Sequence, residues 1–98
     1  MNSANRLEIT AHITELEPLR YTPSGVPVLN GCIEHESQAR EAGQARQVRA
    51  AVRFVAMGAV AESLATQPID SMWWFSGFVA SPKGRKTLLF HIQDVAKH

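Results

Sequence analysis

The chain has 98 residues, enough for one ordinary domain with one hydrophobic core. Apolar residues make up 45% of it and charged residues 19%, a balance typical of a globular protein and not of a disordered one. The formal net charge is only +1, far from the strongly basic balance of many nucleic-acid binders. Any contact with a polyanion therefore depends on local clustering of cations, and we expect a single domain over residues 1–98.

The cellular setting is constrained by features that the chain lacks. A single cysteine, Cys32, excludes an internal disulfide framework and is compatible with a reducing compartment. No window approaches 18 consecutive apolar residues, and the first residues lack the basic region and apolar run of a signal peptide. These features predict a soluble, cytoplasmic protein without a membrane partner.

The first third of the chain alternates apolar and polar residues, the pattern of a half-buried strand. This pattern predicts one strand over residues 6–16 and a second over residues 26–36, although Gly31 contributes no packing there. Between them, residues 22–27 read Thr-Pro-Ser-Gly-Val-Pro, where the prolines preset φ and the glycine accepts a positive φ. We expect a hairpin turn at that point.

The middle of the chain is harder to interpret. Residues 37–47 are polar, have no period of two and contain Gly43, so they predict a mobile loop. From Val48 onward the alternation fits a strand with Arg49 and Arg53 on its outer face. The same stretch is rich in alanine, and Arg46, Arg49 and Arg53 would also share one face of a helix. Periodicity favours the strand and leaves the helix open.

The last third predicts one helix and two strands. Good helix formers follow Gly58, so we expect a short helix over residues 59–66 that ends before Pro68. Residues 71–81 are rich in aromatic and β-branched residues on both faces, as in a covered strand. A basic turn, Ser-Pro-Lys-Gly-Arg-Lys, lies in a mobile loop over residues 81–87, and a final strand extends over residues 87–95.

The predicted order is three strands, a helix and two strands. Five strands with one short helix between strands 3 and 4 is the order of the OB fold, a mostly β barrel. Closure into a five-stranded barrel also removes the exposed strand edges of an antiparallel sheet. We therefore predict an OB-fold barrel.

Several short segments resemble the family of primosomal replication protein N (PriB), relatives of the bacterial single-stranded DNA-binding proteins. The resemblance runs from Asn5 to Val95 and rests on the order and spacing of five segments: residues 5–7 (NRL), 22–27 (TPSGVP), 33–37 (IEHES), 41–43 (EAG) and 76–78 (SGF). It implies a homodimeric, non-enzymatic protein that binds single-stranded DNA in the primosome. It also implies assistance to the PriA helicase and other primosome proteins in restarting stalled replication forks.

In that family, the DNA surface consists of basic and aromatic residues on strands two and three and on the loop between strands four and five. The resemblance places basic contacts at Arg20 and at three cations of the basic turn, Lys83, Arg85 and Lys86. Glu36 stands where some members have arginine, and Arg49 stands where some have tryptophan. These departures predict weaker or differently distributed DNA binding, and they motivate an alternative: a protein-protein adaptor whose DNA surface has decayed.

The cations also have a direct physical interpretation. On a strand, Arg49 and Arg53 project from one face, and guanidinium groups can bind phosphate bidentately and stack on bases. The alternative is that these arginines and the basic turn are solvated surface only. A mobile basic loop that closes over the DNA would bring a visible salt dependence of binding.

The two tryptophans are adjacent and cannot share one face of a strand. Trp73 shares its face with Phe75 and Gly77 and is predicted to be core. Trp74 has three open roles: stacking on a base, covering the end of the barrel, or lying in a subunit interface.

No pattern of a catalytic or cofactor site is present in the sequence. The four histidines, His12, His35, His91 and His98, have no metal-ligand spacing. There is no P-loop, nucleophile elbow or dinucleotide fingerprint, so we expect no cofactor, no metal and no enzyme. Cys32 has no cationic neighbours in the sequence, which predicts a buried, inert thiol.

Overall fold

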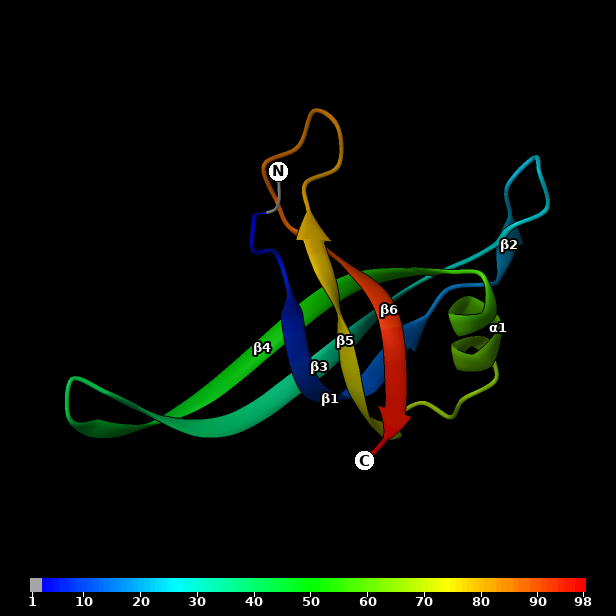
Figure 1. Cartoon of the computed structure of the whole chain (residues 1–98). Coiled ribbons are helices and arrows are strands. Elements are labelled where there is room, and N and C mark those ends of the chain that lie inside the picture. The colour runs from blue at the N-terminus through cyan, green and yellow to red at the C-terminus, as the bar shows by residue number, and fades with distance from the viewer. Residues whose placement is uncertain (1–2) are drawn as a thin grey trace.

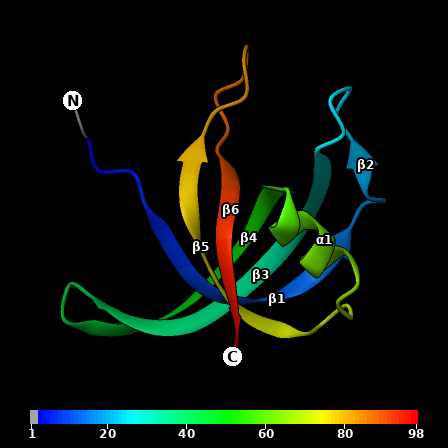
Figure 2. The same cartoon turned by 45° about the vertical axis from the view of Figure 1, so that its right-hand side comes forward.

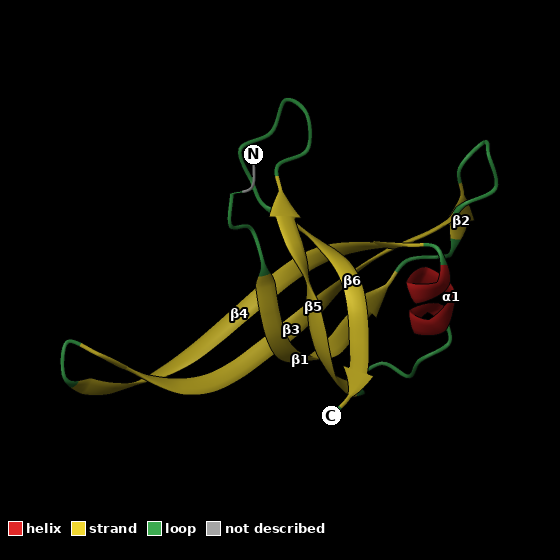
Figure 3. Ribbon diagram, viewed as in Figure 1, coloured by secondary structure: helices red, strands yellow, loops and turns green. Residues whose placement is uncertain are grey.

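A computed structural model describes residues 3–98, which form six strands and one helix (Figures 1 and 3). In chain order the elements are β1 (Leu7–Leu16), β2 (Arg20–Tyr21), β3 (Pro27–Glu41), β4 (Gln44–Met57), α1 (Ala59–Ala65), β5 (Met72–Ala80) and β6 (Leu89–Lys97).

The five long strands close into a barrel. The strand order is β1-β5-β6-β4-β3, and an additional pairing of β1 with β3 completes the circle. Neighbouring strands are antiparallel except β4 and β6, which run parallel over a short register that includes Phe54 opposite Phe90. This closed barrel confirms the predicted mostly β, OB-like fold. The structure adds the two-residue strand β2 beside the start of β3, so the helix lies between β4 and β5 in the numbering used here.

The core is built from the inward face of each long strand. Its largest fully buried side chains include Phe54, Phe75 and Phe90, contributed by β4, β5 and β6. Trp73 is only 9% exposed and belongs to the same cluster, as predicted for it. Burial of apolar surface is the dominant favourable term in folding, so this cluster holds together the strands that carry the surface groups.

The helix α1 is short and packs on the barrel through one face (Figure 2). Ala61 and Leu64 are buried in the core, whereas Glu62 between them is exposed. Its residues agree with the predicted helix after Gly58. No helix within residues 3–98 has the length and apolar character needed to cross a membrane.

Residues 37–47 were predicted to be a loop, and that prediction is wrong. They form the outer part of a long β3–β4 hairpin, which projects from the barrel as an arm (Figure 1). The register continues from Ser37 opposite Val48 to Glu41 opposite Gln44. The two-residue turn Ala42–Gly43 has positive φ at both positions, as a type I′ hairpin turn requires. Apolar alternation is absent because neither face of this segment is buried in the core.

The strand interpretation of residues 48–56 is confirmed, because they lie within β4.

In β3, Gly31 has a role that its lack of packing did not suggest. A Cβ atom added there would overlap the carbonyl oxygen of Glu15 and the ring of Phe54. Glycine therefore permits β1, β3 and the Phe54 ring to approach one another closely.

Candidate nucleic-acid interface

The outward face of β4 carries two arginines, as predicted. Arg49 and Arg53 are both exposed, and the small side chain of Ala51 lies between them. Their partners across the hairpin are Glu36 and Cys32, respectively. The pleat of the strand therefore gives this part of the barrel surface two outward guanidinium groups.

Each of these arginines contacts a carboxylate. Arg53 Nη2 lies 3.4 Å from Glu17 Oε2, although the residues are 36 positions apart in the chain. Arg49 Nε lies 3.9 Å from Glu36 Oε1 on the neighbouring strand. All four side chains are substantially exposed, so these ion pairs are weak and water competes for both partners. The sequence analysis did not identify Glu17, because only the fold brings it to β4.

Cys32 differs from its prediction in two ways. It is half-buried and not fully buried, and its Sγ lies 3.8 Å from Arg53 Nη1. The cationic neighbour comes from the adjacent strand of the hairpin, through the register that sets Cys32 opposite Arg53. Cys32 and Arg53 are 21 positions apart in the chain, so the sequence around Cys32 carries no sign of this contact.

Arg20 extends the basic surface along β2. Its Nη2 donates a hydrogen bond to Asn30 Oδ1 on β3 at 2.9 Å. Tyr21, the next residue of β2, is 60% exposed and is the most exposed aromatic side chain among residues 3–98. Arg20 is thereby oriented toward the β3–β4 surface through Asn30.

The basic loop (residues 81–88) connects β5 and β6 and is exposed throughout. A turn within it is closed by a 2.9 Å hydrogen bond from Arg85 N to Pro82 O, and Gly84 supplies the positive φ. Arg85 lines a hollow of about 300 Å³ together with Arg53 and Asn30. Lys83 and Lys86 are exposed on the same loop.

The predicted cations are thus only partly gathered. Arg53 and Arg85 share one hollow, and Arg20 reaches its rim through Asn30. Arg49 instead lines a separate hollow of about 240 Å³ nearer the arm, beside Glu34 and Glu36. The fold therefore gathers Arg20, Arg53 and Arg85 in a central cluster and leaves Arg49 outside it.

Trp74 lies away from this cluster. It is half-buried on β5, opposite Thr10 of β1, and its Nε1 donates a 3.0 Å hydrogen bond to Glu8 Oε1. In the barrel, β6 separates β5 from β4. Trp74 is therefore grouped with the surface of β1 and not with Arg49 and Arg53.

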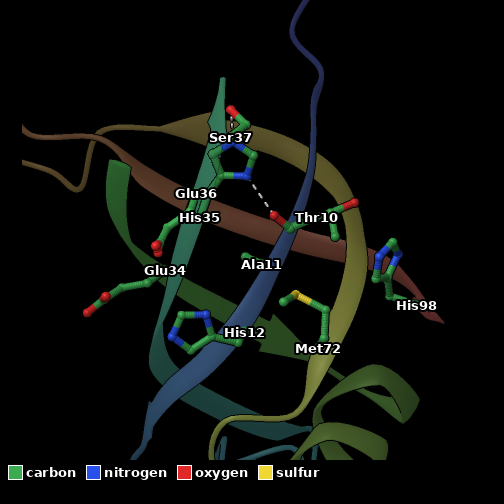
Figure 4. A pocket seen from close by; sticks show the side chains of 9 residues that line it. All are labelled: Thr10, Ala11, His12, Glu34, His35, Glu36, Ser37, Met72 and His98. Carbon is green, nitrogen blue, oxygen red and sulfur yellow. Dashed lines mark hydrogen bonds between the residues drawn. The ribbon is translucent and has the colours of Figure 1, made fainter. Parts of the chain in front are cut away.

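A further hollow of about 360 Å³ lies beside β1, where β3 and the arm diverge from it (Figure 4). There the His35 ring bridges Thr10 O and Ser37 Oγ, each at 2.7 Å. Because a carbonyl oxygen only accepts, Nδ1 of His35 donates to Thr10. Three histidines line this hollow, yet no group of three or more His, Cys, Asp or Glu side chains in the described chain could hold a metal ion.

Comparisons with known proteins agree with this architecture. The model of a family described as "another single-strand binding protein family" matches residues 5–94. The Replication restart protein PriB of Bordetella pertussis is 34% identical over 94 residues, covering 95% of this chain and 88% of that protein.

Solved structures point to the same protein family. PriB from Ralstonia solanacearum superimposes with a TM-score of 0.88 at 35% identity, over 98% of this chain and 99% of that one. The single-stranded DNA binding protein from Thermus aquaticus shares the fold, with a TM-score of 0.75 at 18% identity over 95% of this chain and 49% of that one. The chain therefore belongs to the PriB family of replication restart proteins, within a single-strand binding protein family.

Proposed function

We propose that this chain binds single-stranded DNA over the outer face of β3 and β4 and the basic loop, as a non-enzymatic accessory of replication restart. The observation that carries the proposal is the shared hollow of Arg53 and Arg85, with Arg20 held toward it by Asn30. Three separate elements thus direct guanidinium groups to one surface. Family membership supports the same function.

The chemistry of this surface suits a phosphate backbone. Guanidinium groups pair with phosphate oxygens through charge-assisted hydrogen bonds that need no particular base. Lys83 and Lys86 add positive charge on the loop beside the hollow. Proteins that bind single strands without sequence preference combine such a positive groove with aromatic side chains on which the bases stack.

We also propose that the protein acts as a homodimer joined through β1. Residues 7–12 of β1 pair with β5 on one side, whereas pairing with β3 begins only at His12. The other edge of residues 7–11 therefore has no partner strand within the described chain. An open strand edge favours pairing with another strand, and a second copy of β1 supplies one.

Within the primosome, the proposed protein partner is the PriA helicase. A dimer presents its DNA surface twice, so it can hold DNA while another protein acts on it. We expect the protein to stimulate unwinding by PriA on forked DNA. The Lys83→Ala/Arg85→Ala variant should lose most of this stimulation if the effect depends on DNA binding.

The direct test is fluorescence anisotropy of a labelled oligo-dT of about 30 nucleotides, longer than the roughly 4–16 nucleotides covered by one OB fold. We expect binding that weakens as salt is raised, with a log-log slope of about −0.7 for each phosphate neutralised. Lys83→Ala/Arg85→Ala should weaken binding and reduce that slope. Absence of binding at low salt would refute the proposal.

A second candidate function is that of a protein-protein adaptor. The observation that favours it is the pairing of Arg53 with Glu17 and of Arg49 with Glu36, which partly neutralises the β4 surface. An adaptor would stimulate the helicase without needing its own DNA contact. Helicase stimulation that survives the Lys83→Ala/Arg85→Ala substitutions would favour this function over the first.

A further inference from the structure

The end of the basic loop lies against a second hollow, which is mainly apolar. Its volume is about 400 Å³, and its apolar walls include Leu7, Val52, Val79 and Phe90 from four different strands. Sites for small organic groups are concave and apolar, with volumes of about 300–1,000 Å³ and a few polar groups at their margins. The hollow meets that description in size and in character.

Leu88 borders this hollow and is the most exposed of the large hydrophobic side chains of residues 3–98, at 67%. A single exposed leucine needs no explanation by itself. Leu88, however, also lines the neighbouring hollow that contains Arg85, and Arg53 and Thr87 line both as well. A hollow that holds two arginines and a mainly apolar hollow thus share a boundary formed by these three residues.

We propose that the apolar hollow receives one base of bound single-stranded DNA, with Leu88 as the platform on which the base packs. The inference rests on the proposed DNA-binding function and assigns a base site to it. The adjoining Arg53 and Arg85 would hold the phosphates flanking that base. A base packs on an aliphatic surface through its apolar face, so this site would not select sequence by hydrogen bonding.

Charge complementarity favours a nucleotide strand over other occupants of this hollow. Arg53 lies at its margin, and the basic loop that leads into it carries Lys83, Arg85 and Lys86. An occupant that uses both features combines an apolar part with neighbouring negative charge, and each nucleotide of a single strand has both. The exposed aromatic Tyr21 lies on β2 and is not among the residues that line either hollow.

The test measures the affinity of wild-type protein, Leu88→Ser and Ile69→Ser for two labelled oligonucleotides, oligo-dT and an abasic strand of equal length. Ile69 is a matched control because it is 50% exposed and lies in the α1–β5 connection, outside both hollows. We expect Leu88→Ser to bind oligo-dT about five- to tenfold more weakly, a change of about 1.0–1.4 kcal/mol. Thermal unfolding should be unchanged, because the replaced side chain is exposed.

Two further readouts separate a base contact from a phosphate contact. The weaker binding of Leu88→Ser should disappear with the abasic strand, and its salt slope on oligo-dT should equal that of the wild type. Lys83→Ala should instead weaken binding to both strands and reduce the slope by about 0.7.

Each outcome is decisive. If the wild type binds oligo-dT and Leu88→Ser binds as Ile69→Ser does, the base site is refuted while DNA binding stands, and an apolar peptide becomes the occupant to test. An equal loss of affinity for both strands would also refute it, because Leu88 would then act through the shape of the loop. Failure of the wild type to bind oligo-dT would overturn both the base site and the proposed function.

Discussion

At the scale of single residues, the proposed DNA surface is defined by acidic side chains as much as by basic ones. Glu17 and Glu36 lie 3.4 Å and 3.9 Å from the guanidinium groups of Arg53 and Arg49. A phosphate that approaches either arginine has to displace a carboxylate from it. These two acids should therefore limit DNA affinity without contacting DNA.

Replacing the first of these acids should tighten DNA binding. We expect Glu17→Gln to lower the Kd for oligo-dT about two- to fivefold at low salt, because exposed ion pairs are worth about 0.2–1 kcal/mol. Anisotropy titration measures the change. Glu62→Gln on the exposed face of α1 is the control, since it alters net charge equally. Equal effects of both substitutions would show that only the overall charge matters.

Gly31 is a residue whose function is steric. Gly31→Ala should destabilise the fold by about 1–3 kcal/mol, because its methyl group would overlap Glu15 O and the Phe54 ring. Urea denaturation followed by tryptophan fluorescence measures this through the denaturation midpoint. An unchanged midpoint would mean that β1 and β3 can separate at no cost, contrary to their packing around Phe54.

At the scale of elements, the arm formed by β3 and β4 shows where a pattern of hydrophobicity stops being informative. Alternation predicted the inner parts of both strands, where one face lies on the core. It did not predict the outer parts over residues 37–47, where both faces are exposed and cross-strand hydrogen bonds alone define the strands. Over these residues, the cross-strand register and the two-residue turn specify the strands, and burial does not.

The turn of the arm can be improved. Ala42 has a φ of 52°, a conformation that costs an L-residue with a Cβ roughly 1–2 kcal/mol and that asparagine tolerates better. Ala42→Asn would create the Asn-Gly pair preferred in such turns, and we expect about 0.5–1 kcal/mol of added stability. Thermal unfolding measures this added stability. Ala39→Asn, at a strand position of the same arm, is the control and should not stabilise the protein.

At the scale of the whole molecule, the open edge of β1 is the part of the barrel that a second copy would complete. Ile13 exchanges hydrogen bonds with the segment preceding β5, and Thr10 O instead faces His35 on the opposite side. Because backbone groups alternate along a strand, the amides of Glu8 and Thr10 point away from β5. His35 already occupies the Thr10 carbonyl, so pairing with a second copy should centre nearer Glu8.

Hydrogen exchange can test the dimer through these amides. In a dimer joined at β1, the amides of Glu8 and Thr10 should exchange slowly at high protein concentration and faster on dilution, whereas Ile9 should stay protected by β5 in both cases. Amide exchange monitored by NMR distinguishes the residues. Fast exchange of Glu8 and Thr10 at every concentration would contradict pairing through β1.

The half-buried parts of the long strands, the helix and the position of the basic loop follow from the amino-acid sequence, because burial of one face imposes a local period that can be read along the chain. Its ordered segments also indicated the family. The three-dimensional fold alone sets which charges meet, as for Glu17 with Arg53, and which apolar groups surround Leu88. These contacts depend on strand register and barrel closure, which join residues far apart in the chain and leave no periodic pattern in it.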